Sequence, residues 1–156
     1  MTTLKESTEY LSTLEKGLSV LKCFTRERPE MTLSDVAKAT QLNPAVVRRC
    51  LLTLQALGYV GKNDNLFFLK PKVLEFGSQF NDIFNVDNTL RPLLQRMRDK
   101  TGDSASFAVL SEGEVLYVCH ASTYRVIRMQ AAAGTRFPAL NTSLGRAILS
   151  SWSDHE

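Results

Sequence analysis

The segment TLSDVAKATQLNPAVVRRCLLTLQALGYV, residues 32–60, carries a close series of helix start signals. Thr32 and Asp35 have the spacing of a capping box, in which a hydroxyl and a carboxylate satisfy the free amides of a first helical turn. Asn43 and Pro44 favour a second start, because a residue before proline avoids the α region and proline is tolerated in the first turn. We therefore expect two short helices joined by a tight turn.

The second of these helices is expected to run from Pro44 until Gly58, a residue type that favours a helix end. At about 100° per residue, its apolar side chains fall within one broad arc. They are Val46, Val47, Cys50, Leu51, Leu54 and Leu57. Arg48 and Arg49 lie on the other side with small Ala45, as in a helix that approaches base edges closely. Leu52 also points outward, against the following hairpin or a partner chain.

Residues on both sides of this pair of helices complete a small domain. Apolar runs at 59–61 and 66–69 flank a polar turn at 62–65 and predict a β-hairpin. Upstream, Ser12 and Glu15 form a second capping-box pattern. Leu14, Leu18, Leu21 and Phe24 then recur at helical spacing. The sequence therefore predicts a winged helix-turn-helix over residues 12–70, with three helices and a β-hairpin wing.

This order of elements bears on the arginine pair, which in an arbitrary amphipathic helix would be a solvated face. A short helix, a turn, a longer helix and a hairpin are typical of proteins that read DNA. The predicted DNA contacts are Thr32, Asn43, Pro44, Ala45, Val47, Arg48, Arg49, Lys62, Asn63 and Asn65, with Val47 common to this set and the apolar arc. The alternative is a protein-binding winged helix whose arginines face an acidic partner.

The charge distribution agrees with a DNA-binding first part. The chain has 19 basic and 16 acidic residues. Up to Phe76 there are 11 basic against 8 acidic residues, and after it 8 against 8, so the net charge of +3 belongs to the first part. Because this excess is small, we expect phosphate contacts on one face, two copies of the domain and strong salt dependence.

A linker helix is predicted over residues 71–86. Its apolar residues return at steps of three and four: Val73, Phe76, Phe80, Ile83 and Phe84. The core of a winged helix is complete without this stripe. The stripe therefore needs another surface to cover it, either the following domain of the same chain or the same helix of a second copy. We favour the second copy, because readers of this type pair on the two half-sites of a palindromic operator.

Residues 87–156 change from a helical to a strand-like pattern and predict the beginning of an α+β domain. Asp87 and Asn88 are expected to break and recap the chain before a helix that ends near Gly102. A hairpin follows over 104–119, and a third strand is expected at 125–130. Further on, we expect a loop at residues 134–139 and a short helix capped by Thr142 or Ser143. Three strands leave a sheet edge unpaired, so this domain is expected to be incomplete.

The sequence favours no enzyme, cofactor or metal site. Cys119 and His120 are the only adjacent thiol and imidazole, and neighbours on a strand point to opposite faces. Cys23, Cys50 and Cys119 are expected to be reduced and mostly buried. No signal peptide or membrane-length apolar run is present, so a cytoplasmic protein is expected.

Several runs resemble the IclR-type transcriptional regulators, in that family's order. They are residues 14–21, 32–37, 48–54, 57–60, 134–139 and 142–147. Arg48 and Arg49 with 51–54, and residues 68–71, are most similar to the subgroup that controls aromatic-acid breakdown through the β-ketoadipate route. The resemblance implies a homodimer or tetramer that binds double-stranded DNA. It also implies a GAF-like effector domain that senses a small aromatic or dicarboxylic acid.

Candidate effector residues are small hydroxyls beside strand ends and a helix start, which suit a carboxylate. We predict Ser106, Met129, Leu140, Thr142 and Ser143, although each residue singly also suits capping or core filling. Arg125, Arg128 and Arg136 either pair with an acid ligand or are solvated. Since members of the family have a longer effector domain, the chain is expected to carry only its first part. A constitutive DNA binder without a functional sensor is the remaining alternative.

Overall fold

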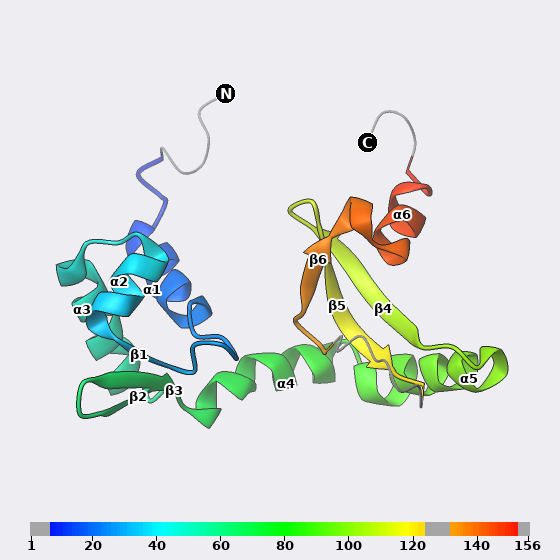
Figure 1. Ribbon diagram of the computed structural model, residues 1–156, viewed down its shortest axis with the longest axis horizontal. Helices are drawn as coiled ribbons and strands as arrows, with labels where there is room; N and C mark the ends of the chain where they lie inside the picture. The colour runs from blue at the N-terminus through cyan, green and yellow to red at the C-terminus, as the bar shows by residue number, and fades with distance from the viewer. Residues whose placement is uncertain (1–6, 124–131, 153–156) are drawn as a thin grey trace. The chain divides into compact units, whose positions relative to one another are not determined.

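The computed structural model describes residues 7–123 and 132–152, which form two compact units (Figure 1). The chain divides between Gly77 and Ser78, inside the segment 71–86 predicted as a linker. Within the described residues, no helix has both the length and the apolarity needed to cross a membrane.

The first unit is the predicted winged helix-turn-helix. Its elements are α1 (Ser12–Lys22), β1 (Glu30–Thr32), α2 (Leu33–Thr40), α3 (Pro44–Ala56), β2 (Val60–Asn63) and β3 (Leu66–Leu69). The two strands of the predicted hairpin pair antiparallel, and the hairpin tip is the dipeptide Asp64-Asn65. The three-residue strand β1 was not predicted; it pairs with β3 and gives a sheet of order β1-β3-β2.

The helix starts in the helix-turn-helix are built as the sequence predicts. The amide of Asp35 donates to Thr32 Oγ1, and the amide of Thr32 donates to Asp35 Oδ2, which completes the capping box. Asn43 Oδ1 accepts from the amide of Ala45, with Pro44 in the first turn of α3. Gly58, at φ +84°, follows the end of α3.

The capping box predicted for α1 is wrong. Leu11 occupies the cap position without a side-chain hydrogen bond, and Ser12 is the first residue of the helix. The predicted inner stripe of α1 is wrong in part, because Leu14 and Leu18 are 59% and 47% exposed. Val20, which is fully buried, faces the core instead. Periodicity indicates an apolar face of a helix, but the domain core covers only part of this face.

The core of this unit joins α1, α2, α3 and the sheet. Its buried residues are Val20, Cys23, Phe24, Met31, Val36, Ala37, Val47, Cys50, Leu51, Leu54, Val60 and Phe67. On α3, most of the predicted arc is buried as expected. Leu57 is the exception: at the last turn it is 53% exposed. Leu52 points outward as predicted.

A short 3₁₀ turn, η2 (Pro71–Val73), leads into α4 (Leu74–Ile83), which is the predicted linker helix. The break after α4 occurs at Asn85, whose backbone is left-handed at φ 50°. Asp87 and Asn88 do not recap the chain as predicted; they lie inside a π-helical turn, η3 (Val86–Leu90), that runs directly into α5 (Arg91–Thr101). Asp87 instead accepts a 2.7 Å hydrogen bond from Arg91 Nε.

The second unit contains an antiparallel three-stranded sheet, β4 (Ala105–Ser111), β5 (Glu114–Ala121) and β6 (Arg136–Pro138). The loop predicted at residues 134–139 is therefore corrected, because its middle is a strand paired with β5. The third strand predicted at 125–130 lies outside the described residues. After η4 (Ala139–Asn141), α6 (Ser143–Leu149) begins with Thr142 as its cap, which confirms one of the two predicted caps.

Helices α5 and α6 cover opposite faces of this sheet (Figure 1). A bulge in β5 divides its buried residues between these two faces: Phe107 pairs with Cys119 and Ala108 with Tyr117, so Val118 has no opposite partner. On one side of the bulge, Cys119 belongs to the cluster with Leu94 of α5. Beyond it, Tyr117 belongs to the cluster with Leu144 of α6. The three cysteines are free and buried, as predicted.

Candidate nucleic-acid interface and sensor residues

The exposed side of α3 brings together most of the predicted DNA contacts. Asn43, Pro44, Ala45, Arg48 and Arg49 are all exposed. Neither guanidinium has a carboxylate partner within the described residues, so both are available to an external anion. The N-terminus of α3, with its partial positive charge, lies at the same end as these residues.

Val47 does not belong to this surface, and its predicted contact with DNA is wrong. Its side chain is fully buried in the core between α3 and its neighbours. Thr32 is half-buried, and its hydroxyl donates to Asp35 Oδ2 at 2.6 Å while accepting the amide of Asp35. The hydrogen bond from the Thr32 hydroxyl, followed by that from its amide, holds the pKa of Asp35 below its ordinary value. Thr32 therefore serves the start of α2 with both its polar groups.

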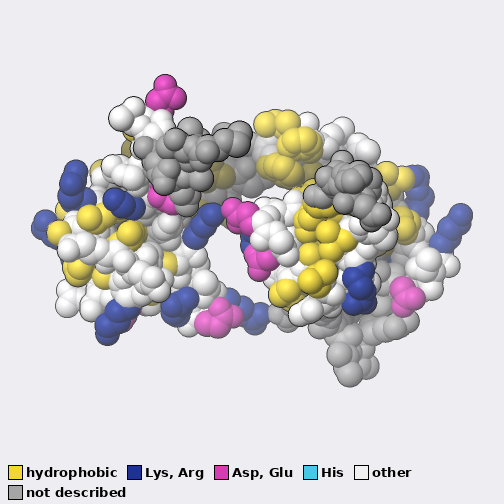
Figure 2. Space-filling model, turned by 90° about the horizontal axis from the view of Figure 1, so that it is seen from above, with side chains coloured by type: hydrophobic (Ala, Val, Ile, Leu, Met, Phe, Trp, Pro, Cys, Tyr) yellow, Lys and Arg dark blue, Asp and Glu magenta, His cyan; other side chains and the backbone are white. Residues whose placement is uncertain are grey.

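The wing presents the remaining predicted contacts. Lys62, Asn63 and Asn65 are exposed at or beside the hairpin tip. Lys62 Nζ lies 5.6 Å from the centroid of the Phe67 ring, which directs the stem of the lysine along the sheet. Lysine and arginine side chains lie on several sides of this unit in Figure 2. Net charge alone therefore selects no face, and the choice of α3 and the wing depends on their geometry.

A groove on the same unit was not predicted. It has a volume of about 440 Å³ and runs between α1 and α3, with Tyr59 and Phe76 beside it. It is lined by Leu14, Leu18 and Leu57, which were expected to be buried in the core but are exposed. Arg49 also lines it, so this residue borders both the outward side of α3 and the groove. The sequence does contain a sign of this groove, because the first unit has more apolar side chains at helical spacing than one small core can bury.

The predicted effector residues lie in two places. Ser106 is on β4, on the same face as Ala108 and thus on the α6 side of the sheet. Its hydroxyl is 2.7 Å from Nδ1 of His120, a contact that the sequence did not suggest. Burial lowers the pKa of His120 below its ordinary value, which favours the neutral imidazole.

The other candidates surround the start of α6. Thr142 Oγ1 accepts from the amide of Gly145 at 3.0 Å and caps the helix, while Ser143 and Leu140 are exposed. Met129, like Arg125 and Arg128, lies outside the described residues. Neither alternative for Arg136 fits: it is half-buried and bonded to Ser111, Glu112 and Glu114, so its charge is balanced within the hairpin.

Comparison with known proteins decides the family. Residues 13–64 match the IclR helix-turn-helix domain, and residues 80–156 match the bacterial transcriptional regulator IclR C-terminal domain. The chain belongs to the IclR family. Its winged helix and its α+β unit with a GAF-like sheet are the two parts of that family's architecture, in the expected order.

Individual relatives match the sequence of this IclR-family chain over more than nine tenths of its length. It is 31% identical over 147 residues to the Pca regulon regulatory protein of Pseudomonas putida, covering 94% of this chain and 50% of the relative. It is also 31% identical over 147 residues to the p-hydroxybenzoate hydroxylase transcriptional activator of Acinetobacter baylyi, covering 91% and 54%. The chain thus spans about half the length of these curated relatives.

A solved structure extends the comparison to the fold. The crystal structure of an IclR homolog complexed with 4-hydroxybenzoate from Microbacterium hydrocarbonoxydans matches with a TM-score of 0.71 at 20% identity. The match covers 92% of this chain and 60% of that chain. At this identity the likeness concerns the fold alone.

Proposed function

We propose that the protein is a sequence-specific, DNA-binding transcription regulator of the cytoplasm and not an enzyme. The observation that carries this proposal is the exposed start of α3, where Ala45 lies between the Asn43 cap and two arginines, Arg48 and Arg49, that have no carboxylate partner among the described residues. A small residue there allows close approach to a base edge, and each guanidinium can bond guanine bidentately or grip phosphate. Lys62, Asn63 and Asn65 of the wing hold the neighbouring backbone.

The proposal is tested by selecting duplexes from a random library with the purified protein. We expect enrichment of one palindromic sequence, with an affinity that falls steeply as salt rises, because bound phosphates release counterions. Enrichment of no sequence at any salt concentration would instead support the protein-binding alternative, in which α3 faces an acidic partner.

The regulator is proposed to act as a homodimer. A tetramer would be formed by two such dimers. Two apolar surfaces support this. On α4, Phe76, Phe80 and Ile83 are exposed by 55%, 44% and 75%, and Phe84 follows them beyond the helix end. Val73, the fifth residue of the predicted stripe, is half-buried. The groove beside α1 is the second surface. A second copy would cover such apolar side chains and present a second α3 to the other half-site.

Replacing Phe80 and Ile83 by glutamate should separate the dimer. Two carboxylates in an apolar interface are poorly solvated and repel their symmetry mates, so we expect the dissociation constant to rise by about a hundredfold or more. Sedimentation velocity over a concentration series measures this. Ser78→Glu, an exposed position on the opposite side of the same helix, is the matched control and should leave the dimer intact. An unchanged dissociation constant in the double variant would place the interface elsewhere.

The ligand is proposed to be a small aromatic or dicarboxylic acid, and the controlled genes to serve aromatic-acid breakdown. The relative named for p-hydroxybenzoate hydroxylase supports the aromatic class. Ser106, Thr142, Ser143 and Leu140 remain the proposed contacts, joined by His120 through its contact with Ser106. Calorimetric titration with 4-hydroxybenzoate and with succinate tests the ligand class. Absence of binding heat for both would favour a constitutive DNA binder.

A further inference from the structure

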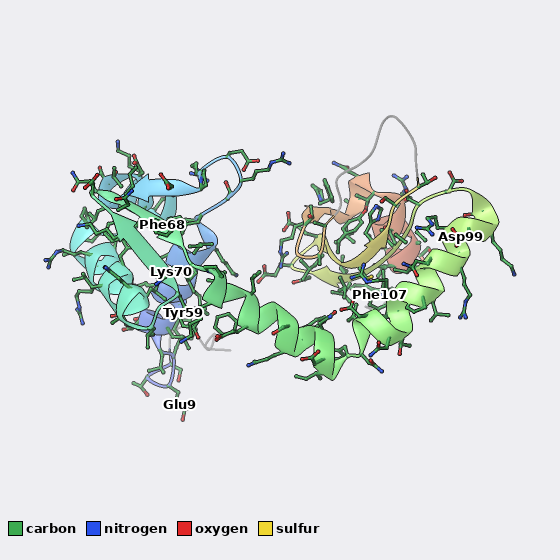
Figure 3. All side chains as sticks on the ribbon, turned by 90° about the horizontal axis from the view of Figure 1, so that it is seen from below. Glu9, Tyr59, Phe68, Lys70, Asp99 and Phe107 are labelled. Atoms are coloured by element: carbon green, nitrogen blue, oxygen red, sulfur yellow. The ribbon has the colours of Figure 1, made fainter. Side chains whose placement is uncertain are left out.

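The start of the linker helix is attached to the end of α3 by side chains outside the main core. After β3 the chain turns back, and the amide of Lys70 donates to the carbonyl of Tyr59 at 2.8 Å. Lys72 Nζ then donates to the carbonyl of Leu57 at 3.0 Å. Figure 3 shows Tyr59 and Lys70 beside the point where α4 leaves this unit. We call Leu57, Tyr59, Lys72 and Phe76 the linker joint.

Lys72 is well placed to complete the end of α3. The last carbonyls of a helix lack intrahelical donors and carry a partial negative charge, which a cation satisfies. The lysine stem runs beside Gly58, where a Cβ would be in ordinary van der Waals contact with Lys72 Cδ, at 3.6 Å. The ammonium also lies 5.1 Å from the centroid of the Tyr59 ring, within reach of a cation–π interaction.

The aromatic half of the joint continues into the first turns of α4. The Tyr59 and Phe76 rings are stacked, with centroids 5.4 Å apart and an angle of 22° between their planes. Tyr59 therefore contacts both Lys72 and Phe76, and the Lys72 ammonium also donates to the Leu57 carbonyl at the end of α3. Because Lys72 and Phe76 precede and follow the start of α4 at Leu74, they hold its first turn at two points.

We infer that Lys72 is a positioning residue that fixes the direction of the linker helix relative to the recognition helix α3. The inference rests on the proposed function as a dimeric DNA reader. In a dimer joined through α4, the direction in which α4 leaves each winged helix sets the separation of the two α3 helices. A rigid joint then selects one half-site spacing, whereas a loose joint accepts several.

Lys72→Met tests this role, because methionine keeps the length of the stem but removes the ammonium. The affinities of the variant and of the wild type are measured for the selected half-site alone, for the selected palindrome, and for palindromes in which one or two base pairs are inserted or removed between the half-sites. We expect the wild type to lose about tenfold or more in affinity on a changed spacing, and Lys72→Met to lose at most a few-fold. Half-site affinity should be unchanged.

Two further variants separate position from charge. Lys70→Met removes an equal charge from a neighbouring exposed position and should keep the wild-type preference for one spacing. Lys72→Arg can still donate to the Leu57 carbonyl and stack on Tyr59, so it should restore the preference. An unchanged spacing preference in Lys72→Met, or an equal loss on the half-site, would overturn the role of Lys72 as a positioning residue.

Amide hydrogen exchange measures the joint without DNA. The amides of residues 72–77 should exchange at least several-fold faster in Lys72→Met, with α1 and α2 unchanged. This arm separates the two hypotheses: if the wild type selects no duplex, the proposed function fails, while the joint is still judged by its exchange. Exchange at the wild-type rate in residues 72–77 of Lys72→Met would refute the joint itself.

Discussion

Replacing both Arg48 and Arg49 by alanine should lower the affinity for the selected duplex by about a hundredfold or more at moderate salt. Both guanidiniums are exposed at the start of α3 without carboxylate partners in the described residues, so their charges are free to meet DNA. Each side chain that binds phosphate should also reduce the slope of log affinity against log salt by about 0.9. Fluorescence anisotropy across a potassium chloride series measures both quantities.

The single variants distinguish a base contact from a phosphate contact. Loss of a base contact relaxes the sequence preference at one position, whereas loss of a phosphate contact weakens all duplexes alike and lowers the salt slope. Arg96→Ala combined with Lys100→Ala removes the same charge from exposed positions on α5 of the other unit and is the matched control. If the α3 double variant binds like this control throughout the salt series, the recognition-helix hypothesis is wrong.

Gly145→Ala should destabilise the second unit by about 2–4 kcal/mol, since an added methyl group has no room. A Cβ at Gly145 would lie 2.5 Å and 2.6 Å from the carbonyl carbon and Cα of Ala139, and closer still to its oxygen. These are backbone atoms, so no side-chain rotation relieves the overlap. Helix α6 would have to move away from η4, which would also weaken the Thr142 cap.

Trp152 gives a convenient probe for this change, because it is the only tryptophan and lies just beyond α6. We expect its fluorescence transition to move down by about 10 °C or more in Gly145→Ala, given the size of the unit. Ala147→Gly, the reverse substitution at an exposed position of the same helix, is the control. It should lower the free energy of unfolding by only about 1 kcal/mol. Equal melting temperatures for the two variants would show that the Ala139 contact is not tight.

Local features of this fold could be predicted because their causes are local. The Thr32 capping box, the Asn43 cap, the end of α3 at Gly58 and the turn before Glu114 each follow from the chemistry of a few neighbouring residues. The strands β1 and β6 could not be found in this way. Each has three residues, too few for a period, and exists because β3 or β5 offers it a partner.

The candidate site was predictable to a similar extent. The arginine pair and the wing followed from the order of elements. Val47 could have been excluded as well, because the apolar arc already placed it on the inner side of α3, where the structure buries it. The opposite error occurred for Leu14, Leu18 and Leu57, which were expected in the core but line the groove. Apolar periodicity alone does not distinguish a core face of a helix from an apolar face on the surface. Arg136 and Lys72 depend on contacts 22 and 15 residues away, which no local pattern contains.

The bulge at Val118 has a consequence for how this chain can change over evolution. Along β5, buried and half-buried residues alternate without interruption, yet those before and after the bulge serve different helices. Val118 is the extra residue of the bulge, so its loss would leave Tyr117 paired with Ala108 and Cys119 with Phe107, and the side chains of Tyr117 and Cys119 would still point to opposite faces. Position 118 should therefore tolerate the loss of its residue as well as many replacements, because the pairing and the facing of the residues on each side of the bulge do not depend on it.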